Sequence, residues 1–270
     1  MTGPFVDITD GHRLYVRDWG AGRPVLLLAG WGLDSRIWGA TMAALADAGL
    51  RALACDRRGH GRSTDPGRVD YDLLADDLAA VLDTTDLRGL TVVAHSGAAG
   101  EVLRYMSRHG AARIERLILV GAAGPKMIST AKDMPGIPAS AVEAVIAQLR
   151  DDLPAWIEEN ARAFAPQADA RTIDWLAGMV SDASRRILID FQRVIAEADL
   201  IEEARAVTVP VTLIHGDRDA SCPIDLTARR YADIIPAAEL LVYEDAAHGL
   251  MLGHGARLAA DIVERMSIGG

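Results

Sequence analysis

Short apolar runs alternate along the chain with stretches in which apolar residues recur at helical spacing. The runs predict eight strands, at residues 5–7, 14–18, 25–29, 52–55, 90–94, 114–120, 211–215 and 240–243. Stripes such as Tyr71, Leu74 and Leu78 predict amphipathic helices between them. The first two strands flank Asp10-Gly11, a favoured hairpin turn, and form an antiparallel pair. The later alternation of strand and helix predicts an α/β fold with a mostly parallel twisted sheet and helices on both faces.

Residues 125–205 interrupt this alternation. Helical patterns occupy 140–150, 154–164, 171–180 and 184–204, prolines punctuate them, and no strand-like run intervenes. A helical excursion between two strands is typical of a cap over the sheet edge where ligands bind. We therefore expect a core of residues 1–124 and 206–270 with a helical cap, 125–205, inserted in it. Most large apolar cap side chains should pack against one another, but some are candidates for a substrate pocket: Met127, Trp156, Phe164, Trp175, Met179 and Phe191.

Composition narrows the class of protein. The 270 residues are half apolar, enough for one large α/β domain or two small ones. Lys and Arg number 28 against 38 Asp and Glu, so the net charge of −10 argues against nucleic acid or an anionic membrane as a partner. No run of about 18 apolar residues predicts a membrane span. The N-terminus lacks the basic start and apolar stretch of a secretory signal, so we expect a cytoplasmic protein.

Metal and cofactor chemistry have no support in the sequence. Cys55 and Cys222 lie far apart, lack Cys-x-x-Cys partners and are expected to be packing residues. No His, Cys and Asp cluster has metal-ligand spacing. The loop Gly59-His60-Gly61 lacks the Gly-Lys-Ser/Thr of a phosphate loop and is expected to shape the sheet edge. We expect neither a metal nor a cofactor.

The first candidate for catalysis is Ser96, at the turn after the fifth strand. Ala94-His95-Ser96-Gly97-Ala98 stands between a strand and a helical pattern, the arrangement of a nucleophile elbow. Such a turn is strained, and the small residues Ala94 and Ala98 suit it. Taken alone, the pattern is equally typical of a serine that caps a helix.

Two further residues follow the ends of later strands and change this interpretation. Asp219 comes after the strand at 211–215, and His248 after the strand at 240–243. The carboxyl ends of parallel strands meet at one edge of a sheet, where active sites form. The chain order serine, acid, histidine is that of an α/β-hydrolase triad. The pattern predicts Ser96 as nucleophile, His248 as base and Asp219 as the acid that orients it, with Asp217 as a less favoured acid that lies less far out in the turn.

An acyl-transfer site also needs two backbone N–H donors for the developing oxyanion. Gly97, at the start of the helix after the serine, is the first candidate, and Trp31, in the loop after the third strand, is the second. Among the other histidines, His95 is expected to point away from the elbow and His215 to lie inside a strand end. His60 and His254 are expected to be loop residues.

Several stretches together resemble the α/β-hydrolase superfamily, and within it the bacterial cofactor-free haloperoxidases and aryl esterases (perhydrolases). The resemblance covers about residues 1–125 and 205–267. The matching stretches are Gly30-Trp31-Gly32-Leu33-Asp34 with Trp38, Cys55-Asp56-Arg57-Arg58-Gly59-His60-Gly61-Arg62-Ser63, Tyr71-Asp72, Ala75-Asp76-Asp77-Leu78, Val93-Ala94-His95-Ser96, Arg104-Tyr105, Arg108-His109-Gly110, His215-Gly216-Asp217-Arg218-Asp219, Pro223-Ile224, Tyr243-Glu244 and Ala247-His248-Gly249.

The resemblance implies an α/β-hydrolase fold, the same triad and the same oxyanion donors. It also implies cleavage of a small ester or lactone through an acyl-enzyme. In many members hydrogen peroxide replaces water and yields a peracid that oxidises halide without metal. The chain departs from the family at three positions: Ala29 replaces a histidine, Ala98 a glycine, and Gly97 a Met, Leu or Gln. The change at Gly97 is expected to leave more room at the oxyanion hole.

Three functions follow from these patterns. The leading one is a serine hydrolase whose partner is a small-molecule acyl substrate, with perhydrolase or haloperoxidase side activity. The alternative is a cofactor-independent dioxygenase, lyase or cyclase in which His248 and Asp219 act as a base and Ser96 only orients the substrate. The third is a ligand-binding receptor, against which the intact triad argues. The sequence leaves the substrate and homo-oligomer formation open.

Overall fold

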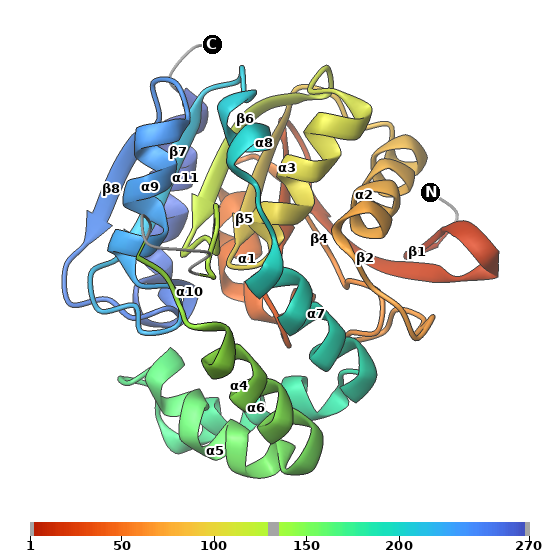
Figure 1. Cartoon of the computed structure of the whole chain (residues 1–270). Coiled ribbons are helices and arrows are strands. Elements are labelled where there is room, and N and C mark those ends of the chain that lie inside the picture. Colours follow the sequence, from red (N-terminus) through yellow and green to blue (C-terminus); the bar gives the residue numbers. More distant parts are fainter. Residues whose placement is uncertain (1–2, 129–134, 268–270) are drawn as a thin grey trace.

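A computed structural model describes residues 3–128 and 135–267 of the chain (Figure 1). The described residues contain one eight-stranded sheet, in the order β1-β2-β4-β3-β5-β6-β7-β8. The strands are β1 (Phe5–Asp7), β2 (Arg13–Gly20), β3 (Pro24–Leu28), β4 (Arg51–Cys55), β5 (Leu90–His95), β6 (Ile114–Val120), β7 (Val211–Gly216) and β8 (Glu239–Tyr243). The predicted fold class, with about eight strands in a mostly parallel sheet, is confirmed.

Within the described sheet, β2 alone runs antiparallel to its neighbours. β1 and β2 form the predicted hairpin, and β2 also pairs antiparallel with β4. From β4 to β8 every neighbouring pair is parallel. The carboxyl ends of β3 and β5–β8 therefore share one edge of the sheet, and the loops that follow these strands meet there.

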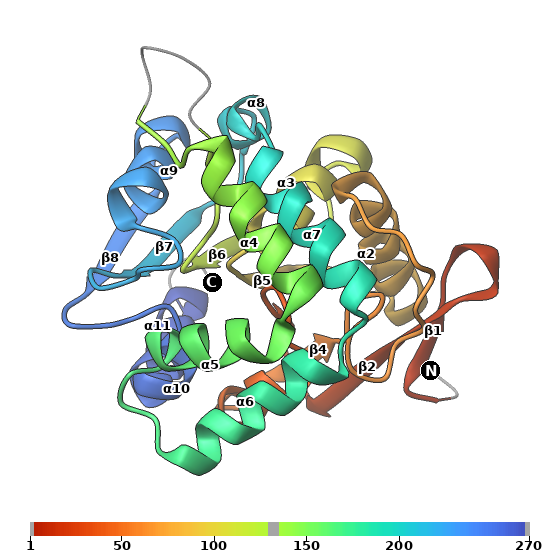
Figure 2. The same cartoon turned by 60° about the horizontal axis from the view of Figure 1, so that its bottom comes forward.

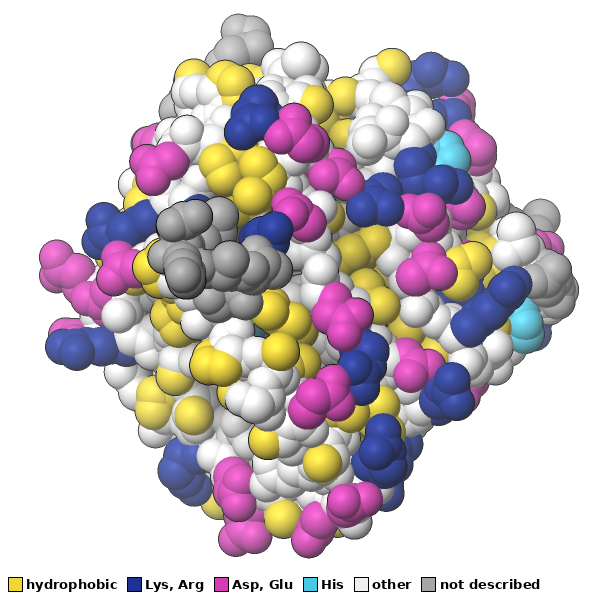
Figure 3. Space-filling view, viewed as in Figure 1, with side chains coloured by type: hydrophobic (Ala, Val, Ile, Leu, Met, Phe, Trp, Pro, Cys, Tyr) yellow, Lys and Arg dark blue, Asp and Glu magenta, His cyan; other side chains and the backbone are white. Residues whose placement is uncertain are grey.

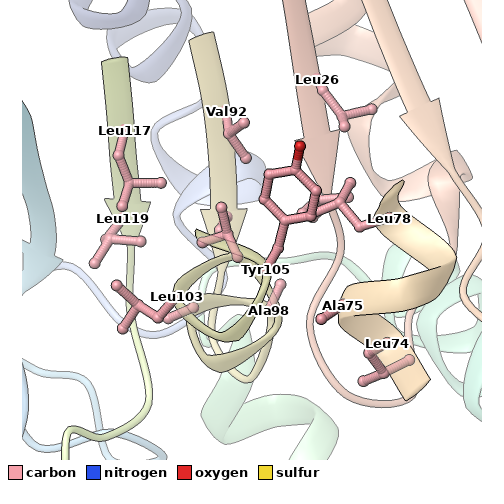
Figure 4. Close-up of a cluster of buried hydrophobic side chains, with 14 of the residues drawn as sticks. Leu26, Leu74, Ala75, Leu78, Val92, Ala98, Leu103, Tyr105, Leu117 and Leu119 are labelled. Atoms are coloured by element: carbon pink, nitrogen blue, oxygen red, sulfur yellow. The ribbon is translucent and has the colours of Figure 1, made fainter. Parts of the chain in front are cut away.

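Alternate residues of the central strands pack against two layers of helices. Val92 faces α2 (Tyr71–Thr85) and α3 (Ala98–His109), whereas Val93 faces the opposite layer. Figure 4 shows the first of these cores, in which Leu26, Val92 and Leu117 meet side chains of α2 and α3. The opposite layer consists of α1 (Gly39–Asp47) and α11 (Gly255–Ser267), and their contact completes the second core. Because both faces are covered, the strands are apolar nearly throughout.

The chain between β6 and β7 contains helices and no strand within the described residues. The helices are α4 (Ala139–Asp151), α5 (Leu153–Phe164), α6 (Ala170–Asp182), α7 (Arg185–Glu197) and α8 (Ile201–Arg205). Figures 1 and 2 show α4–α7 grouped together beyond one end of the sheet. The predicted helix at 184–204 is in fact two helices, α7 and α8. The break falls where Asp199 forms a β-bridge with Lys126 and the Leu200 N–H donates to the carbonyl of Pro125.

Five short helices complete the fold within the described residues: η1 (Thr9–Gly11), η2 (Ser35–Trp38), η3 (Ile224–Leu226), α9 (Ala228–Ile234) and α10 (Leu250–Gly253). η2 leads directly into α1. Among the described residues, no helix has the length and apolarity needed to cross a membrane. On the face in Figure 3, acidic and basic side chains are intermixed, so neither sign of charge collects there.

Candidate active site

Ser96 occupies a sharp turn between β5 and α3. Its φ angle of 56° lies in the left-handed region, which few non-glycine residues adopt. The backbone holds this conformation from several sides, because the Ser96 N–H donates to Val120 and the Ser96 carbonyl accepts from Ala99 and Ala123. The Tyr71 hydroxyl donates to the Gly97 carbonyl at 2.9 Å. The hydroxyl of Ser96 is therefore presented on a rigid turn at the carboxyl edge of the sheet.

Ser96, His248 and Asp219 form one hydrogen-bonded chain. His248 Nε2 lies 3.0 Å from Ser96 Oγ, and His248 Nδ1 lies 2.7 Å from Asp219 Oδ2. All three residues are buried, with relative exposures of 8 %, 5 % and 5 % for Ser96, His248 and Asp219. A carboxylate can only accept, so Nδ1 carries the proton and Nε2 is free to accept one from the serine.

Asp219 is fixed from both sides of its carboxyl group. Oδ1 accepts the backbone N–H groups of Ser221 and Cys222, and Oδ2 lies 3.2 Å from His215 Nε2 as well as near His248. Burial by itself would raise the pKa of Asp219. The nearby His248 and the hydrogen bonds from His215 and His248 outweigh it and hold that pKa well below its usual range. Asp217, the other acid considered, is exposed. It follows the end of β7, and its backbone N–H donates to the Tyr243 carbonyl of β8.

The candidate oxyanion donors lie on the two loops that flank Ser96. Within the part of the chain that the structure describes, neither the Trp31 N–H nor the Gly97 N–H has an acceptor. The Trp31 side chain is anchored, because its indole N–H donates to the Leu188 carbonyl at 2.7 Å. The next residue is anchored too, because the Gly32 N–H donates to Nε2 of His60 at 3.3 Å. The two unused N–H groups therefore sit on a well-fixed backbone.

His60 acts in this contact as a neutral imidazole. Its Nδ1–H donates to the Arg58 carbonyl at 3.0 Å, which leaves Nε2 as the acceptor for Gly32. Burial, with the nearby Arg57 cation, lowers the pKa of His60 to about 4. The loop Gly59-His60-Gly61, expected to shape the sheet edge, thus supports the loop that carries Trp31.

The expectation of more room beside Gly97 was wrong. A Cβ atom on Gly97 would lie 2.4 Å from Ile195 Cδ1 and 3.3 Å from Phe191 Cζ. Both side chains belong to α7, so a helix distant in sequence occupies the volume that a larger residue would need. Ala98 is fully buried in the core between α2 and α3, where Figure 4 labels it.

A cavity of about 300 Å³ opens beside Ser96 and His248 under α4–α7. Of the six candidate pocket residues, three line this cavity and three do not: Met127, Trp156 and Phe164 line it, and Trp175, Met179 and Phe191 do not. Trp175 is 38 % exposed, and Met179 is buried in the core with α1 and α11, because other positions of α6 face the cavity. Those α6 positions are Leu176, Ala177 and Val180. The described lining contains no Lys, Arg, Asp or Glu, and its polar side chains outside the triad are His95, Asn160, Gln192 and Ser221, with the thiol of Cys222.

His95 and Cys222 lie closer to the site than expected. The His95 Nε2–H donates to the His248 carbonyl at 3.2 Å, and the two imidazole rings are 4.7 Å apart. Cys222 is a buried residue of the cavity wall and gives its backbone N–H to Asp219. Periodicity could not find these contacts, because they depend on how loops cross at the sheet edge. Within the described residues, no group of three His, Cys, Asp or Glu side chains could hold a metal ion.

Comparison with known proteins places the chain in a family. The family model described as "alpha/beta hydrolase fold" matches residues 23–254. The chain belongs to the α/β-hydrolase family and is an enzyme of that family.

Individual relatives match over nearly the full length. A non-heme chloroperoxidase of Kitasatospora aureofaciens is 35 % identical over 93 % of this chain and 94 % of its own. A bifunctional esterase/perhydrolase of Acinetobacter calcoaceticus is 30 % identical over 91 % of this chain and 93 % of its own. Among solved structures, an esterase from Exiguobacterium antarcticum superposes with a TM-score of 0.94 at 28 % identity, covering 98 % of this chain and 99 % of that one.

Proposed function

We propose that the protein is a serine esterase that cleaves small, uncharged carboxylic esters or lactones through an acyl-enzyme on Ser96. The observation that carries this proposal is the hydrogen-bonded chain Ser96–His248–Asp219 at the wall of an apolar cavity. We further propose that residues 125–205 serve as the cap that closes this cavity and selects the acyl group.

The geometry supports a complete acyl-transfer cycle. His248 Nε2 takes the proton of Ser96 Oγ as the serine attacks the carbonyl carbon, and Asp219 stabilises the imidazolium that forms. The unpaired N–H groups of Trp31 and Gly97 receive the oxyanion. His248 then protonates the leaving alcohol, and in the second half it deprotonates the water that releases the acid.

The cavity supports a small and uncharged acyl group. A volume of about 300 Å³ is at the lower end of roughly 300–1,000 Å³ for ligand pockets. A carboxylate or phosphate on the substrate would lack a cationic partner in the described lining, and burying an unpaired charge is costly. Asn160 and Gln192 can instead hydrogen-bond a neutral polar group.

A perhydrolase side activity belongs to the same proposal. Hydrogen peroxide can take the place of water at the acyl-enzyme: His248 removes one peroxide proton, the peroxide oxygen bonds to the acyl carbon, and Ser96 leaves with its proton restored. The product is a peracid. The relatives named as chloroperoxidase and as esterase/perhydrolase support this side reaction.

Covalent labelling of Ser96 tests the nucleophile. We expect a fluorophosphonate to add one phosphonyl group to the native protein, and mass spectrometry of peptides to place it on Ser96. The Ser96→Ala variant should take up none, and its kcat/KM for p-nitrophenyl acetate should fall by about 10⁴-fold or more. A native protein that hydrolyses no graded p-nitrophenyl ester and takes up no label would contradict the proposal.

The same variants separate hydrolysis from the non-hydrolytic alternative. If Ser96 is the nucleophile, Ser96→Ala and His248→Ala should lose turnover to a similar extent, because the two act as a unit. If the base works without the serine, Ser96→Ala should lose much less turnover than His248→Ala.

Peroxide and bromide test the perhydrolase side activity. With a carboxylic acid as the acyl source, the native enzyme should brominate monochlorodimedone, and the Ser96→Ala variant should not.

A further inference from the structure

Arg57 is a buried cation directly behind the loop that carries Trp31. Its exposure is 5 %, and its guanidinium donates to two backbone carbonyls of that loop: Nη2 to Ala29 O at 2.7 Å and Nη1 to Gly30 O at 3.2 Å. Nε and Nη2 also donate to Oε2 of Glu101 at 3.0 and 2.8 Å. The acyl-transfer steps above do not use this group.

The Gly30 carbonyl and the Trp31 N–H belong to the same peptide unit. Because a trans peptide is planar, they point in opposite directions, and holding the carbonyl fixes the direction of the N–H. A cation bound to the carbonyl also withdraws electron density from the peptide, which makes the N–H a stronger donor. Arg57 therefore acts on the candidate oxyanion donor from the far side, without touching the substrate.

Three elements that build the site meet at Arg57. The loop after β4 supplies Arg57 itself, α3 supplies Glu101 one turn after the elbow, and α7 supplies Phe191, whose ring lies 4.6 Å from the guanidinium carbon. The same Phe191 packs near Gly97. Arg57 therefore contacts both the loop that carries Trp31 and the elements that pack against the turn of Ser96 and Gly97.

We propose that Arg57, anchored by Glu101, is a positioning residue for the oxyanion hole. Arg57 sets the peptide plane of Gly30–Trp31 so that the Trp31 N–H faces the tetrahedral intermediate. This proposal rests on the proposed function, because it requires Ser96 to be the nucleophile. Because a pre-oriented donor stabilises the transition state more than the bound substrate, loss of Arg57 should lower kcat rather than raise KM.

The adjacent residue offers a matched control. Arg58 is also buried and pairs with a buried carboxylate, Asp77, through Nε and Nη2 at 2.7 and 2.6 Å. Its third donor reaches the Arg68 carbonyl instead of the loop that carries Trp31. The two pairs share chemistry, burial and sequence position, but only the Arg57 side chain binds the oxyanion loop. Arg58 reaches that loop only through its backbone carbonyl, which accepts from His60 and which a side-chain substitution retains.

The test compares two double variants in the full-length protein, Arg57→Met/Glu101→Leu and Arg58→Met/Asp77→Leu. Removing both partners avoids leaving a single buried charge. For p-nitrophenyl acetate we expect the first variant to lose about 10- to 100-fold in kcat, somewhat less than loss of a whole donor, with KM within about threefold. The inhibition constant of a trifluoromethyl ketone, which forms an alkoxide with Ser96, should rise by the same factor as kcat falls. The second variant should keep kcat and the inhibition constant within about threefold even if its melting temperature drops equally.

The single variant Arg57→Lys keeps the test decisive if a double variant does not fold. Lysine retains the charge but not the planar fork, so kcat should fall about 10-fold with a rise in the ketone constant. Equal kcat losses in the Arg57 and Arg58 variants, or a loss without any change in the ketone constant, would overturn the role of Arg57. A native protein that neither turns over esters nor takes the fluorophosphonate would overturn the proposed function instead, so the two failures are distinguishable.

Discussion

At the scale of single residues, the two carboxylate oxygens of Asp219 have different partners: one accepts from the backbone and the other from the His248 imidazole. Oδ1 accepts two backbone N–H groups, from Ser221 and Cys222, while Oδ2 accepts from His248 Nδ1 and also lies 3.2 Å from His215 Nε2. An amide in this place keeps the backbone contacts only if its oxygen faces Ser221 and Cys222. Its NH₂ group would then face His248, and a donor there forces the imidazole to carry its proton on Nε2.

We therefore expect Asp219→Asn to lower kcat for p-nitrophenyl esters by roughly 10⁴-fold, because the wrong tautomer cannot accept the serine proton. The fold should persist, as measured by circular dichroism and thermal melting. Asp217→Asn is the matched control: Asp217 is exposed, and its variant should retain native kcat. A larger loss in the Asp217 variant than in the Asp219 variant would reverse the assignment of the acid.

At the scale of elements, the contact between the elbow and α7 replaces a side chain that the resembled family places after the serine. Ile195 and Phe191 fill the space next to Gly97, so the wall beside the candidate oxyanion hole comes from a helix about a hundred residues later in the chain. Gly97 has φ −59°, which any residue can adopt, and so only packing restricts this position.

Gly97→Met should lower the free energy of unfolding by about 1–3 kcal/mol, because it overpacks the contact with Ile195. It should also lower kcat, since the shifted turn carries one of the oxyanion donors. Adding Ile195→Ala makes space, so the double variant should recover stability relative to the sum of the single effects, by about 1 kcal/mol or more in a double-mutant cycle. Strictly additive effects in urea unfolding would show that α7 does not set the size of residue 97.

At the scale of the whole molecule, the fold buries His60 and His95 in their neutral form. Burial, with the nearby Arg57 cation, lowers the pKa of His60 to about 4. Burial, with the neighbouring His248, lowers the pKa of His95 well below its usual range. Since the folded protein binds fewer protons than the unfolded chain, these histidines make stability rise with pH between about 4 and 6.5. Buried carboxyls with raised pKa values, such as Asp77 and Glu101, act in the opposite direction.

We expect the contribution of His60 to be present in full above pH 6.5 and to be lost as the pH falls towards about 4. In His60→Gln, the amide oxygen can accept the Gly32 N–H without titrating. The free energy of unfolding of the native protein, minus that of this variant, should therefore decrease by up to about 3 kcal/mol between pH 6.5 and 4. Urea titrations at several pH values measure it, and the differencing removes the carboxyls from the comparison. A constant difference would show that His60 is not held neutral.

Much of the fold could be predicted from local pattern. The strands at 25–29, 90–94 and 211–215 are apolar because both faces are covered, and a covered strand has a distinct signature in sequence. The chain order of Ser96, Asp219 and His248 was also readable, since each follows a strand. Boundaries were harder: a long helical pattern at 184–204 is broken by a bridge between Asp199 and Lys126, and no local signal marks a contact that distant in the chain.

The sequence by itself determined the fold class, the sheet and the three side chains that stand at its carboxyl edge, because those features follow from periodicity and from the parallel direction of the strands. Only the tertiary structure decided which cap residues face the cavity, what fills the space beside Gly97 and what Arg57 binds. These depend on helix rotation and on loops that cross, and side-chain spacing along one element carries no record of its partner in another. Trp175 on the surface and Ile195 over the elbow are the two clearest instances.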